Sequence, residues 1–545
     1  MESQTARDLI DRQAKLAGER LTYESWWQDI AELVMPSQAR FQRQDTPGFA
    51  RALRAYDSTA PLALSVFGSA MESMLTPRTQ RWHRLQAKDP RLQGRLPVRR
   101  AMDQVTDLLF RRRYAPDANF AQQMQETFKS LGGFGTACLY VDRHPGGGNW
   151  YKALHLSEVW IAESYYGRID TVFRRPKLTA RKILQRWGDK APAKVKEAAE
   201  KDPQRQFEML HAVFPNAEVK PHAMDHRRLA WASFWVLVDG AELVDVGGFG
   251  TMPYIASRYI SEPGEIYGWS PALLALADIK MLNEMARTDI SGRHRKAFPP
   301  LLTQSADWLQ LSNSNGKINL RPNAVNTGWL DERGNPMIRP LDTGTDLKAV
   351  DDGMEVRRQN IREAFLVNLF EVLIERPRMT ATEVLQRAQE KGALLAPTVG
   401  RQEAETLGPL IERELDLAHQ DGALPEDLPD DVLEDFEYDV IYESPLAKAA
   451  LAEQGLAILQ TLEGWSLLGQ VQPEVYDNLD TDAAALRLSE INGMPADLLR
   501  DRRVIEALRQ QRAQQQALAA AVESAPAAGG LVRDLAQASK AGDQS

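Results

Sequence analysis

The sequence predicts a mainly helical α+β protein, and three patterns carry that prediction. Apolar residues recur every three or four positions among charged ones near both ends of the chain, which predicts amphipathic helices. Short alternating runs rich in aromatic and β-branched residues lie within 134–175 and 207–260 and predict strands, with a helical insert at 180–201. In the middle, two long amphipathic segments flank a shorter region with strand and turn signals. The sheet is therefore expected in the first half of the chain.

The composition is that of a globular protein with an acidic surplus. Of 545 residues, 43% are hydrophobic and 26% are charged, which is typical of a folded chain. The length allows roughly three or four domain-sized units. Asp and Glu (75) outnumber Lys and Arg (66), and the net charge of −9 disfavours nucleic-acid binding through overall basicity. Any contact with DNA is expected to be local.

The single cysteine, Cys138, excludes an internal disulfide and the usual structural zinc arrangements. We therefore expect synthesis in a reducing cytosol. The first twenty residues alternate charges where a signal peptide is apolar, and no stretch approaches the ~18 consecutive apolar residues of a membrane span. The chain is expected to be neither secreted by the usual route nor embedded in a membrane.

The N-terminal part predicts two helices and a basic segment. The first helix covers 1–35, and the second covers 56–75 with Asp57 or Ser58 as its N-cap. Between residues 81 and 113, ten Lys and Arg stand against three Asp. This segment can touch phosphate, or it can be a solvated helix face or a subunit contact opposite acidic residues.

The middle of the chain predicts a long helix, a β-rich insertion and a second long helix. Ser270 can cap the first helix and Pro271 can occupy its first position, and the pattern runs to Pro299. About 45 residues with turn signals follow, including Asn315-Gly316 between two alternating runs. The second helix extends from about Asp346 to Phe370, and each helix is about 40 Å long.

A break and a new helix follow the second long helix. Pro377, within Glu375–Arg378, cannot donate a helical hydrogen bond and disfavours helical geometry in the residue before it. Thr380 and Glu383 have the spacing of a capping box, which predicts that a third helix begins there.

The C-terminal part predicts an acidic strand followed by helices. Residues 421–445 contain ten Asp and Glu and no base around the strand-like run FEYDVIYE, which is typical of an edge or surface strand. Beyond Pro445 the sequence is Ala- and Leu-rich and helical to about Gln510. The last residues are expected to fray.

The sequence contains two incomplete enzyme motifs. The Gly-rich stretches do not continue into the Lys-Ser/Thr of a phosphate-binding loop, so nucleotide hydrolysis is set aside. Gly268-Trp269-Ser270-Pro271-Ala272 resembles a serine-hydrolase elbow in three positions, but Pro271 lacks the backbone N–H that an oxyanion hole requires. Helix capping is therefore the favoured role of Ser270.

Two sets of potential metal ligands have simpler interpretations. His222 and His226 are four residues apart but follow Pro221 and lack a metalloprotease glutamate pattern, which favours a surface loop. A cluster of four acids can in principle hold two Mg²⁺ ions as in a nuclease, although clustered acids on one strand are usually a charged surface. The cluster consists of Glu434, Asp435, Glu437 and Asp439.

Five short motifs occur in order over about 390 residues: Tyr56-Asp57-Ser58-Thr59-Ala60, Ser73-Met74-Leu75-Thr76-Pro77, Tyr267-Gly268-Trp269-Ser270-Pro271-Ala272 with Asp278-Ile279-Lys280 and Leu282-Asn283, Met379-Thr380-Ala381-Thr382-Glu383-Val384, and Ser444-Pro445-Leu446-Ala447. Placed around a core of helix, β-rich tip and helix, they resemble the portal proteins, or head-to-tail connectors, of T7-like short-tailed bacteriophages. The extreme N-terminus and the residues after about 510 lie outside the resemblance.

The resemblance implies a portal fold, in which a ring of subunits, usually twelve, sits at one capsid vertex around a channel for the genome. Its parts would be an N-terminal wing at 1–265, stem helices at 266–298 and 342–370, a β-rich clip at 299–341, a channel loop and C-terminal wing at 371–445, a helical crown at 446–510 and a flexible tail at 511–545.

The resemblance implies no catalytic residue, metal or cofactor, and its candidate residues form four groups. The channel candidates are Glu375, Arg376, Pro377 and Arg378. The stem candidates are Arg287, Arg293, Arg295 and Lys296. The clip docking candidates are Trp308, Asn315, Gly316, Lys317 and Trp329. The structural residues of the family motifs are Tyr267, Gly268, Ser270, Pro271, Asn283, Met379, Thr380, Thr382 and Glu383. Arg376 and Arg378 can touch passing phosphates or form salt bridges between subunits.

The implied function is a channel for genome packaging and ejection, located at the portal vertex of the virion after synthesis in the host bacterial cytoplasm. The implied partners are further copies of the chain, double-stranded DNA, the terminase large subunit, tail adaptor and tube proteins, and major capsid and scaffolding proteins, without a membrane. Two alternatives remain open. One is a head-completion or scaffold ring that does not conduct DNA, and the other is an enzyme such as a metal-dependent nuclease or a serine hydrolase.

Overall fold

The structure is a computed structural model, and it divides into two compact units. It describes residues 2–42, 55–93, 95–217, 219–220, 226–303, 330, 333–336, 338–341, 347–374, 396–425, 437–443, 445–469, 479–491, 494, 498–500 and 504–517. The first unit comprises Met1–Trp82 and Leu109–Ala423, and the second comprises His83–Leu108 and Leu424–Ser545.

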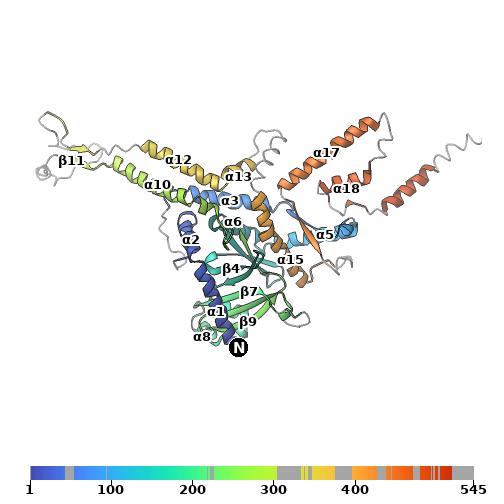
Figure 1. The fold of residues 1–545 in the computed structure, drawn as a ribbon, viewed down its shortest axis with the longest axis horizontal. Coiled ribbons are helices and arrows are strands. Elements are labelled where there is room, and N and C mark those ends of the chain that lie inside the picture. Colours follow the sequence, from blue (N-terminus) through green and yellow to red (C-terminus); the bar gives the residue numbers. More distant parts are fainter. Residues whose placement is uncertain are drawn as a thin grey trace, which may run out of the picture. The chain divides into compact units, whose positions relative to one another are not determined.

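The first unit contains a six-stranded antiparallel sheet, ordered β4–β5–β7–β8–β9 with β6 paired to β7 (Figure 1). Its strands are β4 (Val159–Glu163), β5 (Ile169–Arg174), β6 (Lys177–Thr179), β7 (Gln206–Pro215), β8 (Trp231–Leu237) and β9 (Glu242–Phe249). One face packs on α7 (Ala180–Trp187) and α8 (Ala193–Lys201), and the other packs on α1 (Glu2–Glu19). Met209 and Leu237 point to the first face and Leu210 and Val236 to the second, which is the period-two pattern of a strand covered on both sides.

A second antiparallel sheet of three strands, ordered β10–β2–β3, lies in the same unit. It consists of β10 (Tyr254–Arg258), β2 (Thr136–Arg143) and β3 (Asn149–Leu154). Helices α6 (Phe120–Phe134) and α15 (Gly408–Gln420) pack against it, and a π-helical turn, Glu403–Leu407, leads into α15. The strands predicted in the first half of the chain are confirmed by these two sheets.

The predicted helix over 1–35 is two helices. The chain bends at Arg20, between α1 and α2 (Leu21–Val34). The buried Arg20 guanidinium donates to the carbonyl oxygens of Leu156, at 2.7 Å, and Val159, which fixes the bend against the six-stranded sheet. The second predicted helix is confirmed as α3 (Thr59–Leu75).

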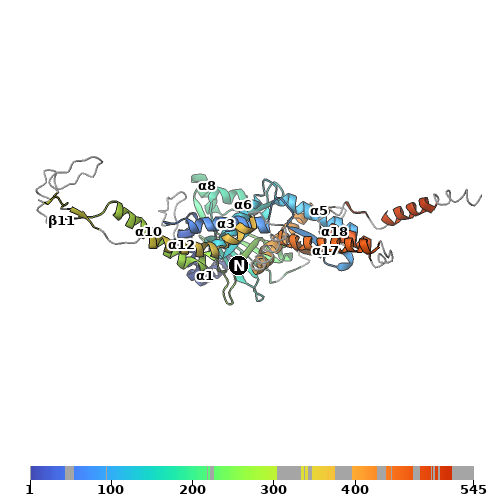
Figure 2. The same ribbon diagram turned by 90° about the horizontal axis from the view of Figure 1, so that it is seen from above.

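Helices α10 (Leu276–Ala297) and α12 (Leu347–Ala364) run side by side, as Figures 1 and 2 both show (Figure 1, Figure 2). A short helix, α9 (Pro271–Leu274), precedes α10. The two long helices lead to an antiparallel strand pair, β11 (Leu301–Thr303) and β12 (Ile338–Pro340). The predicted order of a long helix, a segment with strands and a second long helix is confirmed.

The predicted continuity of the second long helix to Phe370 is wrong. Helix α12 ends at Ala364, and α13 (Val367–Ile374) begins after Leu366, whose φ of +57° lies in the left-handed region. Phe365 and Phe370 both pack on Phe67 of α3, with ring centroids 6.4 and 6.1 Å away. The chain turns at Leu366 so that both rings meet α3.

The second unit pairs β1 (His83–Ala87) with β13 (Tyr438–Tyr442) in a two-stranded antiparallel sheet. The strand predicted in FEYDVIYE is therefore confirmed, and in a two-stranded sheet it is an edge strand. Further helices in the described residues are α4 (Pro90–Gln93), α5 (Leu96–Arg113, its last turn in the first unit), α17 (Pro445–Gly469), α18 (Thr481–Ile491), residues 504–517 and, in the first unit, residues 396–402. In the described part of the chain, 3₁₀ turns lie at Pro36–Gln38, Leu156–Glu158, Gly188–Lys190 and His226–Arg228.

Two glycines bring distant parts of the first unit into backbone contact. Gly135 ends α6 with a φ of +75°, and a Cβ there would lie 2.2 Å from the carbonyl oxygen of Gly268. A Cβ at Gly268 would lie 2.2 Å from the carbonyl oxygen of Gly135. The Gly268 N–H also donates to Thr136 Oγ1 at 2.9 Å. Neither position has room for a side chain.

We expect Gly268→Ala to destabilise the first unit by about 3 kcal/mol, because the new methyl group must push two backbone segments apart. A lowered midpoint in thermal unfolding followed by circular dichroism would show this. Gly18→Ala is the control, since nothing lies within 4 Å of a Cβ there and alanine favours a helix by up to about 1 kcal/mol. Unchanged melting of Gly268→Ala would contradict the close approach.

Candidate functional site: the α10–α12 helix pair

The helix pair is held together by an apolar stripe on each member. Helix α10 buries Ile279, Leu282 and Ala286, and α12 buries Met354 and Ile361. These residues recur every three, four or seven positions, so each helix presents one continuous apolar face to its neighbours. The two helices therefore pack through these faces against each other and against the rest of the first unit.

Ion pairs between the two helices fix their register. Arg293 of α10 lies 2.6 Å from Asp351 of α12 and 2.7 Å from Asp289 of its own helix. Arg357 of α12 lies 3.0 Å from Asp278 of α10. Hydrogen bonds from Arg293 to Asp289 and Asp351 raise the pKa of its guanidinium above the ordinary value. Both pairs are half-exposed, so they orient the helices more than they stabilise them.

The remaining stem candidates lie on exposed surface. Arg287 is 3.7 Å from Glu284 on its own helix. Arg295 and Lys296 are exposed and have no ion-pair partner within the described part of the chain. They stand in the last turn of α10, where positive charge interacts favourably with the helix dipole. The structure thus separates Arg293, which ties the helices together, from three bases that face solvent.

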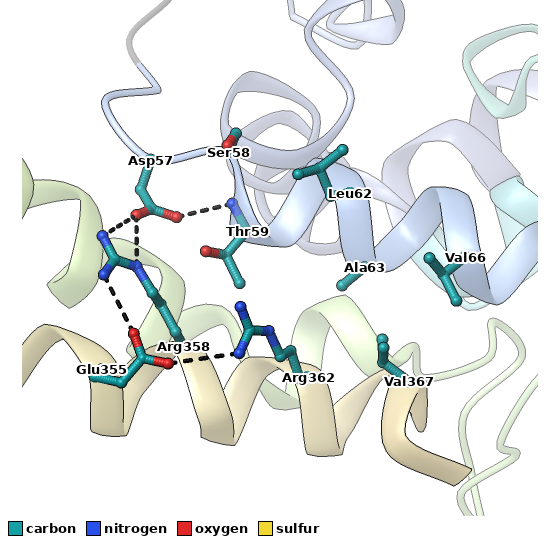
Figure 3. A pocket seen from close by; sticks show the side chains of 10 residues that line it. All are labelled: Asp57, Ser58, Thr59, Leu62, Ala63, Val66, Glu355, Arg358, Arg362 and Val367. Atoms are coloured by element: carbon teal, nitrogen blue, oxygen red, sulfur yellow. Dashed lines mark hydrogen bonds and ion pairs between the residues drawn. The ribbon is translucent and has the colours of Figure 1, made fainter. Parts of the chain in front are cut away.

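One family motif anchors the pair through α3. The Tyr56 N–H donates to Asn283 Oδ1 of α10 at 2.6 Å. Asp57 accepts from the Thr59 N–H at 2.8 Å and from Arg358 Nη2 of α12 at 2.9 Å (Figure 3). Of the two caps left open by the sequence, Asp57 supplies the bond, while Ser58 makes no side-chain cap. This motif and Asn283 therefore join α3 to both helices.

The Asp57 carboxyl is held in its charged form. Burial alone would raise its pKa, but the hydrogen bond from Thr59 and the ion pair with Arg358 outweigh burial and lower the pKa below its ordinary value.

A second family motif, 267–272, anchors the start of α10. Ser270 Oγ accepts from the Leu273 N–H at 2.9 Å and donates to the Gly133 carbonyl oxygen at 2.8 Å. The predicted cap at Ser270, with Pro271 in the first helical position, is confirmed for α9. The predicted continuity of the long helix from Ser270 is wrong, because α9 ends at Leu274 and α10 begins after Ala275, without a side-chain cap. Ser270 is buried and both functions of its hydroxyl are used, so it is not an exposed nucleophile. Tyr267 packs edge-on against Trp27 with ring centroids 5.1 Å apart.

A buried ion pair that the sequence did not predict lies beneath the second sheet. Arg113 Nε donates to Glu414 Oε1 at 3.0 Å, and both side chains are fully buried. The Tyr151 hydroxyl donates to the same carboxylate at 2.6 Å, and Arg113 lies 4.5 Å from the centre of the Trp82 ring. Burial lowers the pKa of Arg113, but the charge of Glu414 outweighs this and raises it. Arg113 is therefore an interior group. It is not a phosphate contact, a solvated helix face or a subunit contact, as the sequence suggested for this basic segment.

In the sequence, Glu414 is the one residue that could have indicated this buried ion pair. It stands on the face of α15 that buries Leu410, Ile411 and Leu417, where an acid requires a buried partner.

Several predicted site residues lie outside the described residues. These are the channel candidates Glu375–Arg378, the clip candidates in 308–329, and Met379, Thr380, Thr382 and Glu383. His222, Glu434 and Asp435 also lie outside them. Glu437 is described and lies 3.2 Å from Lys88. In the described ranges no three His, Cys, Asp or Glu side chains group as metal ligands, and no helix there is long and apolar enough to cross a membrane.

Comparison with protein families matches residues 6–499 to the family described as "Bacteriophage head to tail connecting protein". The chain belongs to this family. The motifs that anchor the helix pair thus lie within the matched region of a head to tail connecting protein.

Two relatives resemble this connecting protein over nearly their whole lengths. The "Probable portal protein" of Bordetella phage BPP-1 is 28% identical over 526 residues, covering 95% of this chain and 93% of the relative. The "Portal protein" of Salmonella phage epsilon15 is 26% identical over 550 residues, covering 97% and 95%. A solved chain titled "Neck of empty GTA particle computed with C6 symmetry" covers 78% of this chain and 90% of its own length, with 13% identity and a TM-score of 0.34. The family match and the two relatives carry the assignment.

We expect Asp57→Asn to destabilise this connecting protein by about 1 kcal/mol at neutral pH, because the ion pair with Arg358 is lost while an acceptor remains for Thr59. The folded pKa of Asp57 lies below its unfolded pKa, so its contribution is complete above about pH 4 and is lost as pH falls through the folded pKa. Thermal unfolding between pH 7 and pH 3 should therefore be less acid-sensitive in Asp57→Asn. Asp11→Asn, at an exposed position of α1, is the control, and equal acid sensitivity of all three proteins would contradict the prediction.

Proposed function

We propose that this chain is a portal protein, which forms a closed ring at one capsid vertex and a channel for packaging and ejecting the genome. The observation that carries the proposal is the similarity to two portal proteins over more than nine-tenths of this chain. The α10–α12 projection with a strand pair at its end supports it, because that is the order of elements expected for a stem and clip.

The proposed parts of the ring follow the ranges expected from the sequence. The stem comprises 266–298 and 342–370, which contain α10 and α12, and the clip comprises 299–341. The wing comprises 1–265 with 371–445, the crown comprises 446–510, and 511–545 is a tail. The clip docks the terminase large subunit and later the tail adaptor and tube proteins, and the outer parts meet capsid and scaffolding proteins.

The electrostatics suit a channel through which DNA moves. Tight binding would stall movement, since each neutralised phosphate adds affinity through counterion release. Twelve copies carry about −108 (12 × −9), and this charge keeps a duplex centred within the Debye length of about 8 Å. Arg376 and Arg378 are the proposed sites of brief phosphate contacts, with salt bridges between subunits as the alternative.

We propose no catalytic activity for the chain. A serine hydrolase needs an exposed, activated hydroxyl, whereas the Ser270 hydroxyl is buried and engaged at both its donor and its acceptor.

Native mass spectrometry of the purified protein tests the ring. We expect a closed oligomer of about 730 kDa (12 × 61.1 kDa) in a cyclic arrangement. Electron microscopy of the same sample should show a bore wide enough for duplex DNA. A ring with a closed bore would favour the head-completion alternative, and a stable monomer under all conditions would refute the proposal.

A clip replacement tests docking. Thr303 pairs with Ile338, so a short Gly/Ser turn in place of residues 305–337 can close the β11–β12 pair. We expect intact rings that do not package DNA, because the docking surface is removed while the stem remains. A second variant keeps all residues of 305–337 but in scrambled order, and it should likewise form rings that do not package DNA. Normal packaging by the shortened rings would show that motor and tail proteins dock elsewhere.

A further inference from the structure

A groove between α3, α12 and the start of α13 is open to solvent and is lined in part by apolar residues. It has a volume of about 490 Å³, and its apolar lining residues are Leu62, Ala63, Val66 and Val367 (Figure 3). Leu62 is 63% exposed, although it stands on a helix that buries most of its other apolar residues. Exposed apolar surface of this kind beside polar residues is typical of an interaction site.

The charges at the rim neutralise one another. Arg358 pairs with Asp57 at 2.9 Å and with Glu355 at 3.3 Å, and Arg362 lies 3.5 Å from Glu355. Two acids therefore balance two bases. A phosphate backbone requires net positive charge, so the rim does not favour nucleic acid and instead suits an apolar protein surface.

A second exposed apolar surface lies on the opposite side of the helix pair. Leu274 is 58% exposed and Met281 is 49% exposed. Leu274, Met281, Thr288 and Arg295 follow at intervals of seven, so they form one outer stripe on α9 and α10. This stripe faces away from the residues of α10 that are buried, Ile279, Leu282 and Ala286. None of the residues that line the groove of the same chain belongs to α9 or α10.

We propose that the groove of one copy receives Leu274 and Met281 of the next copy in the ring. The inference rests on the proposed ring. A repeated head-to-tail contact needs two different surfaces on each subunit that fit each other, and the groove and the outer stripe are such a pair.

The levels along the helices agree with this contact. Within one chain, Asp278 is level with Arg357 and Asn360, which lie 3.0 and 3.4 Å from its carboxylate oxygens. Rotation about an axis parallel to the helix pair preserves these levels. Met281, three residues beyond Asp278, then meets the part of α12 that carries Glu355 and Arg358 beside the groove.

Cysteine cross-linking tests the contact in the full-length chain. We expect Leu62→Cys combined with Met281→Cys to give, on oxidation with copper phenanthroline or with a short bismaleimide, a ladder of covalent oligomers on a denaturing gel. The native Cys138 is buried, and burial raises the pKa of its thiol to about 12, so it does not interfere. Each single-cysteine variant should stay monomeric on the gel.

The matched control joins Met281→Cys to Tyr166→Cys, a position that is 88% exposed on the β4–β5 turn. It should give no ladder. Intact rings that yield no ladder from the Leu62–Met281 pair, or a cross-link within one chain, would overturn this contact while leaving the portal proposal standing. Absence of rings from the wild-type chain would overturn both.

A second variant measures the contact without cross-linking. Met281→Asp places a charge against the apolar lining of the groove in the next copy. At matched protein concentration, the fraction of protein assembled into rings should therefore fall at least about tenfold. Its melting temperature as a monomer should match the wild type, because Met281 is half-exposed there. Tyr165→Asp, at a 97% exposed position, is the control and should assemble normally. Normal assembly of Met281→Asp would overturn the contact.

Discussion

The direction of the α10–α12 pair within the first unit depends on the contact between Gly135 and Gly268. The two backbones approach so closely that a Cβ on either residue would lie 2.2 Å from a carbonyl oxygen of the other. This contact sets the end of α6 beside the start of α9, where Ser270 bonds both to the end of α6 and to its own helix. Because α9 leads directly into α10, the same few atoms orient the whole projection.

Buried charges perform a similar orienting role for α15. Glu414 is paired with Arg113 in the interior, and Arg258 of β10 pairs with Glu405 of the π-helical turn at 2.8 Å. Removing one partner of the fully buried Arg113–Glu414 pair should cost about 3–5 kcal/mol, because the other is left as an uncompensated charge. Glu405 is partly exposed, so its pair with Arg258 contributes less. Both pairs join residues far apart in the sequence, so they select one placement of α15 over the second sheet.

Local features of the fold were predictable from the sequence, whereas features made by tertiary contact were not. The cap at Ser270 follows from the order of Ser, Pro and apolar residues, which acts within one turn. The Arg113–Glu414 pair spans 301 residues, so no local pattern specifies it. The bend at Leu366 has no sequence signal either, because a leucine with positive φ is imposed by the packing of its neighbours. For the candidate site, the motif residues could be found from their order, but the groove depends on the spacing of α3 and α12.

At the bend, the backbone preference of Leu366 for negative φ is opposed by the packing of Phe365 and Phe370 on Phe67. A non-glycine residue in the left-handed region costs of order 1–3 kcal/mol, and a straight helix through this position would remove that cost. Straightening would also withdraw Phe370 from Phe67, whose ring it contacts in the bent form. Any contact that displaces Phe67 therefore shifts the balance toward a straight helix. The path of the backbone from α12 into α13 therefore depends on the ring of Phe67, a side chain about 300 residues away in the sequence.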